Sequence, residues 1–146
     1  MPKKKEIHES IGHHYIVEAS ACDPKIISNV DKVQQILVKA AEVAKTHVWA
    51  ISVNRFPPNG VSGVIVISES HISIHTWPEY GYAALDFYTC GNSSHPEEAV
   101  VYAVEAFGAS TCHITEITRG LDEGDKIYFH SFVTWEEDFK DSQQEK

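Results

Sequence analysis

A short polar stretch between two apolar runs carries more reactive side chains than a simple turn needs. Glu69 and Ser70 place an acyl donor next to a hydroxyl group, with Ser62 and His75 a few residues to either side and Cys90 further along. Hydroxyl, imidazole and thiol groups are those with which proteins perform nucleophilic and acid–base chemistry. The stretch is therefore the first candidate for a functional site.

Each of these residues also has an ordinary structural interpretation. Taken alone, Ser70 is a polar turn residue, His75 a partly exposed hydrogen-bonding group and Cys90 a small buried hydrophobe. Four other residues could equally have an ordinary role in a hairpin, a turn or the core: Ser62, Glu79, Phe56 and Trp77.

The histidines raise the question of a metal site. The chain has nine, notably His13, His14, His71 and His75. His71 and His75, four residues apart, would lie together on one face of a helix, but here they follow a strand pattern. No metal site is predicted.

Strand patterns flank the polar stretch. Residues 64–67 form a continuous β-branched run, typical of a strand buried on both faces. Residues 72–74 alternate apolar and polar side chains, as a half-buried strand does. Further strands are predicted over residues 14–19, 47–56, 82–89 and 112–117, and residues 126–135 could form one more.

Two helices are predicted to support these strands. Apolar side chains recur every three or four positions between Ser28 and Lys45, which indicates an amphipathic helix. Ser94 and Glu97 have the capping-box spacing of a second helix, which stops at Gly108.

The order β-α-β-β-β-β-α-β predicts an α+β two-layer sandwich. Hairpin-length links between the middle strands favour a mainly antiparallel sheet, and the two helices would cover one face of it. We expect a single domain over residues 1–146, with flexible ends at about 1–10 and 136–146.

Composition restricts the functional classes. A net charge of -9 argues against nucleic-acid binding, which needs a basic surface. No apolar stretch approaches the ~20 residues of a membrane span, and no apolar segment of a secretory signal follows the basic start. Three cysteines cannot all pair within one chain, and a reducing cytoplasm is the expected location.

The polar stretch belongs to a longer series of specific residues. In order, they are Gly60-Val61-Ser62-Gly63, Ile67-Ser68-Glu69-Ser70-His71, Ile74-His75-Thr76-Trp77-Pro78-Glu79-Tyr80-Gly81-Tyr82, Asp86 and Thr89-Cys90-Gly91. This series closely resembles the small prokaryotic S-adenosylmethionine decarboxylase proenzymes. The resemblance spans roughly residues 12–120.

The resemblance implies a decarboxylase that makes its own cofactor. Ser70 would attack the carbonyl of Glu69, and the chain would split into a β chain of residues 1–69 and an α chain of residues 70–146. Ser70 would become a pyruvoyl group that forms a Schiff base with the substrate amine, without metal or pyridoxal phosphate. The substrate would be S-adenosyl-L-methionine, and the products CO2 and decarboxylated S-adenosylmethionine (S-adenosylmethioninamine) for spermidine-type polyamines.

The same resemblance implies roles for the other residues. His75 matches the proton acceptor of the cleavage, Ser62 a serine that assists it, and Cys90 the proton donor of catalysis. Substrate binding would involve Glu79 at the ribose hydroxyls, Phe56 beside the adenine and Trp77 as a further aromatic wall.

Hairpin geometry allows a first check on these roles. If the polar stretch tops a simple hairpin, Ser62 and Gly63 face Thr76 and His75, so Ser62 is within side-chain reach of His75. Five extended residues nevertheless separate Ser70 from His75 by about 16 Å, so their direct contact requires a sharp bend near Ser70. The resemblance alone implies this bend. The resemblance also implies a homodimer of cleaved protomers, (αβ)2, whose sites use both protomers.

Two alternatives remain at this stage. An arginine decarboxylase can be built on the same scaffold, although Glu79 and Phe56 in their proline-rich surroundings fit the nucleoside substrate better. The chain could also be an unprocessed, non-catalytic nucleoside-binding homologue, against which the intact Ser70, His75 and Cys90 argue.

Overall fold

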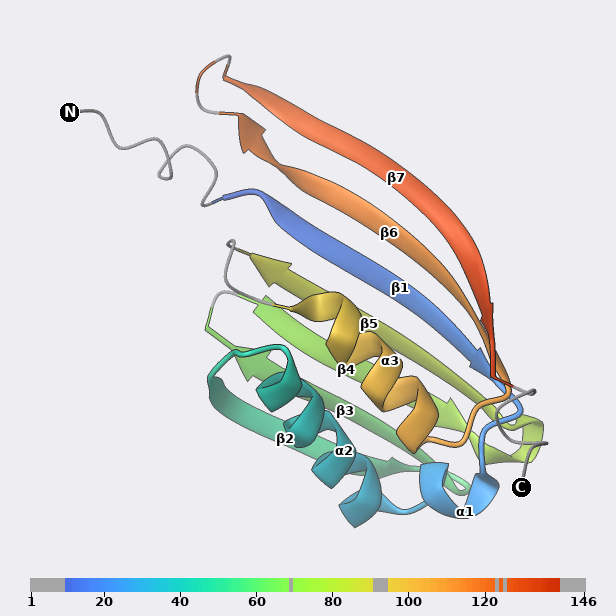
Figure 1. Cartoon of the computed structure of the whole chain (residues 1–146). Coiled ribbons are helices and arrows are strands. Elements are labelled where there is room, and N and C mark those ends of the chain that lie inside the picture. The colour runs from blue at the N-terminus through green and yellow to red at the C-terminus, as the bar shows by residue number, and fades with distance from the viewer. Residues whose placement is uncertain (1–9, 69, 91–94, 123, 125, 140–146) are drawn as a thin grey trace.

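The computed structural model describes residues 10–68, 70–90, 95–122, 124 and 126–139. These form a seven-stranded sheet of order β2-β3-β4-β5-β1-β6-β7, in which every neighbouring pair is antiparallel. Helices cover one face of the sheet (Figure 1), which confirms the predicted α+β sandwich. The strands are β1 (Gly12–Ser20), β2 (Val48–Phe56), β3 (Gly60–Ile67), β4 (Ser70–Trp77), β5 (Tyr82–Cys90), β6 (Thr111–Asp122) and β7 (Ile127–Asp138).

The two predicted helices are present as α2 (Val30–Val43) and α3 (Pro96–Ala106). A short helix that was not predicted, α1 (Pro24–Ile27), precedes them. The first helix was predicted to start at about Ser28 and begins two residues later, because the Asn29 side chain accepts a hydrogen bond from a backbone N–H three residues further on and caps α2 there.

The predicted capping box at α3 is also wrong. His95, not Ser94, is the N-cap residue, and its side chain makes no capping hydrogen bond; Ser94 lies outside the described residues. Pro96 begins the helix, and a proline there has no N–H that would need a partner. The predicted stop is confirmed by Gly108, whose φ of +77° suits a residue without a side chain.

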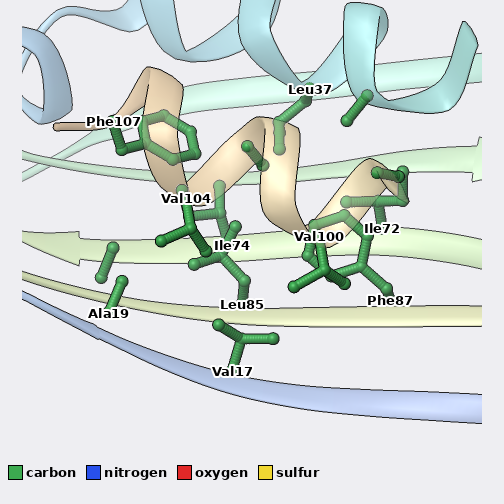
Figure 2. Close-up of a cluster of buried hydrophobic side chains, with 14 of the residues drawn as sticks. Val17, Ala19, Leu37, Ile72, Ile74, Leu85, Phe87, Val100, Val104 and Phe107 are labelled. Atoms are coloured by element: carbon green, nitrogen blue, oxygen red, sulfur yellow. The ribbon is translucent and has the colours of Figure 1, made fainter. Parts of the chain in front are cut away.

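The core lies between the helices and one face of the sheet (Figure 2). Ile74, Leu85 and Val17 pair across three neighbouring strands, so their side chains point to the same side. Leu37 of α2 and Val104 of α3 cover them, and all five side chains are buried. Alternation along the strands thus turns every second side chain toward the helices.

The remaining side chains of the strands point to the other face, which we call the open face. In the described part of the chain, no helix lies over it (Figure 1). Two rows of paired residues cross this face and define its two ends. One row is Ser62, His75, Ala84 and Glu18, and the other is Cys90, Gly12, Arg119 and His130.

The C-terminal hairpin extends the sheet beyond the helices (Figure 1). The additional strand considered over residues 126–135 is present as β7, which reaches Asp138. The prediction of a flexible tail from about residue 136 therefore places its start too early, since residues 136–138 pair with β6. Within the described residues, no helix is long and apolar enough to cross a membrane.

Candidate active site

Ser62 and His75 form the first element of the candidate site. They lie directly opposite one another on β3 and β4, and Ser62 Oγ is hydrogen-bonded to His75 Nδ1 at 2.9 Å. His75 is exposed on the open face. The structure thus brings together two residues that were predicted to act together.

The register that joins them differs by one residue from the prediction. Ser62 was expected opposite Thr76, but Ile67 pairs with Ser70, so only two residues connect the strands. Ser68 has a φ of +43°, a conformation that such two-residue hairpin loops require. The shorter loop moves Ser62 by one position, directly opposite His75. Glu69, the predicted cleavage residue, lies outside the described residues.

A pocket of about 290 Å³ lies beside this pair and collects the predicted substrate-binding residues. The Phe56 and Trp77 rings meet edge to face, with centroids 5.9 Å apart. The Tyr82 ring stacks on Trp77, with centroids 5.2 Å apart. Glu79 reaches the pocket from the short 3-10 helix Pro78–Tyr80. Aromatic walls and one carboxylate suit a flat cationic molecule that carries hydroxyl groups.

Thr76 holds this pocket together and was not singled out from the sequence. Its fully buried hydroxyl accepts a hydrogen bond from Val61 N and donates one to Ile27 O, both at 2.8 Å. Gly60 is required beside it, because a Cβ there would lie 2.5 Å from Thr76 O and 2.8 Å from the Phe56 ring. The sequence did contain a sign of this role, since Thr76 is a polar residue at a strand position where an apolar side chain is expected.

Tyr82 forms a polar boundary of the aromatic wall. Its hydroxyl donates a hydrogen bond to Glu18 on β1. Burial, followed by this hydrogen bond, raises the pKa of Tyr82 to about 12, so the hydroxyl stays protonated at neutral pH.

Ser70 and Cys90 lie together at the other end of the sheet. Ser70 begins β4 and Cys90 ends β5, and the neighbouring residues His71 and Tyr88 pair across these strands. Cys90 is partly exposed on the open face. Beside them, the hydroxyl of Thr89 is buried and has no hydrogen-bond partner among the described residues.

The sharp bend that would join Ser70 to His75 is not present. β4 runs without interruption from Ser70 to Trp77, so the two residues are separated by about 16 Å of extended chain. Being five positions apart, they also point to opposite faces of the sheet. The expectation of direct contact within one chain is therefore wrong, because the continuous pairing of β4 with β3 and β5 keeps it extended.

Between the two ends, the open face carries a polar network. His14 Nε2 lies 2.9 Å from Asp86 Oδ1, and Ser73 donates a hydrogen bond to Asp86 Oδ2 at 3.3 Å. The hydrogen bond with His14 is the main cause that lowers the pKa of Asp86. Burial, followed by repulsion from His14, lowers the pKa of His71. No group of three potential metal ligands is found in the part of the chain that the structure describes.

Comparison with known proteins identifies the family of this site. A family model described as S-adenosylmethionine decarboxylase matches residues 13–120. The S-adenosylmethionine decarboxylase proenzyme of Thermococcus onnurineus is 54% identical over 129 residues, which cover 88% of this chain and 92% of that protein. The protein of the same name from Moorella thermoacetica is 46% identical over 114 residues, 78% of this chain and 91% of that protein.

A solved structure agrees with the sequence comparisons. The crystal structure of the adenosylmethionine decarboxylase from Aquifex aeolicus matches with a TM-score of 0.65 and 25% sequence identity, over 89% of this chain and 91% of that one. The sheet and the helices that position the two groups of residues are thus shared with a decarboxylase. We conclude that the chain belongs to the S-adenosylmethionine decarboxylase family.

Proposed function

We propose that this chain is a self-processing, pyruvoyl-dependent decarboxylase. It converts S-adenosyl-L-methionine to S-adenosylmethioninamine and CO2, and thereby supplies the aminopropyl donor for spermidine-type polyamines. The observation that carries the proposal is the Ser62–His75 hydrogen bond beside an aromatic pocket that also contains Glu79. The family relationship supports the same reaction.

Self-processing would start at Ser70. This residue follows the two-residue loop at the tip of the β3–β4 hairpin, where a break in the backbone leaves the paired strands in place. Cleavage between Glu69 and Ser70 would give a β chain of residues 1–69 and an α chain of residues 70–146. Ser70 would provide the atoms of the pyruvoyl group at the new N-terminus.

The surroundings of Ser70 fit such a group. A pyruvoyl group supplies a carbonyl that accepts the electron pair left behind when CO2 departs. Thr89 lies on the neighbouring strand and, by alternation, on the same side of the sheet as Ser70. Its buried hydroxyl, which has no hydrogen-bond partner among the described residues, could donate to an additional carbonyl oxygen.

The separation of Ser70 and His75 supports a site shared by two protomers. A base must come within hydrogen-bonding distance of the proton that it removes, about 3 Å, whereas β4 holds these residues about 16 Å apart. If two open faces pack around a two-fold axis, the Ser70–Cys90 end of one sheet can meet the Ser62–His75 end of the other. His75 of the partner subunit would then reach the backbone of Ser70 and remove its Cα proton, which does not require the Ser70 side chain to point to the open face.

The open face has the apolar surface that such a dimer needs. Exposed hydrophobic side chains on it include Val66 of β3 and the β7 residues Tyr128 and Phe132. Phe132 is 72% exposed although it pairs with an apolar residue, Ile117. Large exposed apolar side chains on a face without helices are typical of surfaces that bind another protein. The proposed species is the homodimer (αβ)2.

Substrate binding follows from the pocket. The carboxylate of Glu79 can accept hydrogen bonds from the two ribose hydroxyls, and Phe56 and Trp77 offer ring faces to the adenine and the sulfonium cation. Cys90 would then give its proton to the substrate carbon that has lost CO2. Cytoplasmic location remains a prediction of the same proposal.

Intact mass spectrometry under denaturing conditions tests this proposal. We expect two fragments that correspond to residues 1–69 and 70–146, the second with a keto group in place of its N-terminal amine. Ser70→Ala should stay a single chain and release no CO2 from S-adenosylmethionine, while wild-type protein should release none from arginine. A Ser70→Ala protein that is uncut and fully active would refute the mechanism.

A further inference from the structure

Tyr88 lies next to Cys90 on the open face. It precedes Cys90 by two residues on β5, so the two side chains project from the same side of the sheet. Gly12, opposite Cys90 on β1, leaves the room for this contact. A Cβ on Gly12 would lie 2.9 Å from Tyr88 Oη and 3.0 Å from Cys90 Sγ, so the two atoms share the space that a larger residue would occupy.

Charged and aromatic groups from three other strands surround Tyr88. Arg119 of β6 lies over its ring, with Cζ 5.2 Å from the centroid. His14 of β1 and His71 of β4 contact the ring at centroid distances of 6.0 and 5.8 Å. Tyr88 is therefore held from several sides, and its hydroxyl is fixed next to the thiol.

We propose that Tyr88, supported by Arg119, positions the Cys90 thiol and stabilises the thiolate that forms when Cys90 gives up its proton. This inference rests on the proposed function, in which Cys90 is the proton donor. In that step the bond to the carboxyl group breaks, CO2 leaves, and the electron pair on carbon takes the proton from Cys90. The resulting thiolate regains a proton from solvent before the next turnover.

The chemistry of tyrosine suits this role. A hydroxyl that donates to a thiolate makes a charge-assisted hydrogen bond, and a guanidinium group nearby favours the same negative charge. Burial, followed by the interaction with neighbouring Cys90, raises the pKa of Tyr88, so the phenol keeps its proton and can act as a donor. Among the described residues, other titratable groups on the open face around this site are His14, His71, Asp86 and His130, which pairs with Arg119.

The test measures the pKa of Cys90 directly, in uncleaved Ser70→Ala protein that carries isotope-labelled cysteine for NMR. Tyr88→Phe keeps the ring and removes the hydroxyl, so the pKa of Cys90 should rise by about one unit, the effect of one hydrogen bond to a charged group. Cys22 and Cys112 provide internal references, because burial raises their pKa values to about 12 and 11.

Kinetics on the self-cleaved enzyme complete the test. Tyr88→Phe should cleave normally and keep KM, while kcat falls by up to about tenfold, because a weaker acid donates its proton more slowly. Tyr102→Phe, the same change on helix α3 at the other side of the sheet, should leave the Cys90 pKa and kcat unchanged. An unchanged Cys90 pKa together with an unchanged kcat in Tyr88→Phe overturns the inference.

The outcomes separate this inference from the proposed function. If Cys90→Ala turns over at the wild-type rate, the role of Cys90 fails and the inference fails with it. If Cys90→Ala is slow but Tyr88→Phe behaves as wild type, only the inference fails. Should Tyr88→Phe not fold, Arg119→Met decides, since loss of its positive charge should also raise the Cys90 pKa and no change would refute the proposal.

Discussion

Complementation between two inactive variants tests the shared site most directly. Ser70→Ala removes the cleavable residue, and His75→Ala removes the proposed base, so each variant alone should remain uncut. β4 is continuous from Ser70 to His75, which separates them by about 16 Å, roughly 13 Å more than a proton transfer allows. In the mixed dimer that the proposal implies, however, intact Ser70 of one chain would meet intact His75 of the other.

Co-expression of the two variants with different affinity tags provides the assay. Random assortment places about half of the His75→Ala chains in mixed dimers, so about half of these chains should be cut on a denaturing gel, and no Ser70→Ala chain should be cut. Co-expression of differently tagged Ser70→Ala chains is the control. If His75→Ala stays entirely uncut in proven mixed dimers, or if it cleaves efficiently by itself, the reasoning from the straight strand is wrong.

Three further variants test individual contacts. Ser62→Ala loses the 2.9 Å hydrogen bond to His75 and should slow cleavage about tenfold, followed on a gel over time. Thr76→Val keeps the shape of the side chain but leaves two buried backbone groups without a partner, so unfolding in urea should show a loss of about 2 kcal/mol. Asp86→Asn should lower stability at pH 7, because the hydrogen bond with His14 lowers the pKa of Asp86 in the folded state. That contribution is present above the ordinary pKa of 3.8 and is lost as the pH falls through the lower folded-state pKa, so the two proteins should converge in acid.

Matched variants and contrary results complete these three tests. Ser52→Ala, on the neighbouring strand β2, should cleave at the wild-type rate. Cleavage of Ser62→Ala at the wild-type rate would contradict the proposed role of Ser62. Thr115→Val changes a partly exposed threonine and should cost less than Thr76→Val. A stability difference between Asp86→Asn and wild type that is constant from pH 7 down to pH 2 would contradict the assigned cause.

Local patterns in the sequence were sufficient to predict the layers of the fold. Apolar alternation and helical spacing act over a few residues, and they placed the strands around the polar stretch and the two main helices correctly. Errors occurred where a boundary depends on one capping contact, as at Asn29 and His95. Contacts such as that of Thr76 with Val61 and Ile27 join distant segments, and no local sequence pattern predicts them.

The same distinction between local sequence and tertiary contacts applies to the candidate site. The sequence by itself determined which residue types are present, and its resemblance to a family pointed to Ser62, Ser70, His75 and Cys90. Only the tertiary structure decided where they lie, because the length of one hairpin loop sets which residues of β3 and β4 stand opposite one another. That register joins Ser62 to His75, whereas the straight pairing of β4 keeps His75 away from Ser70.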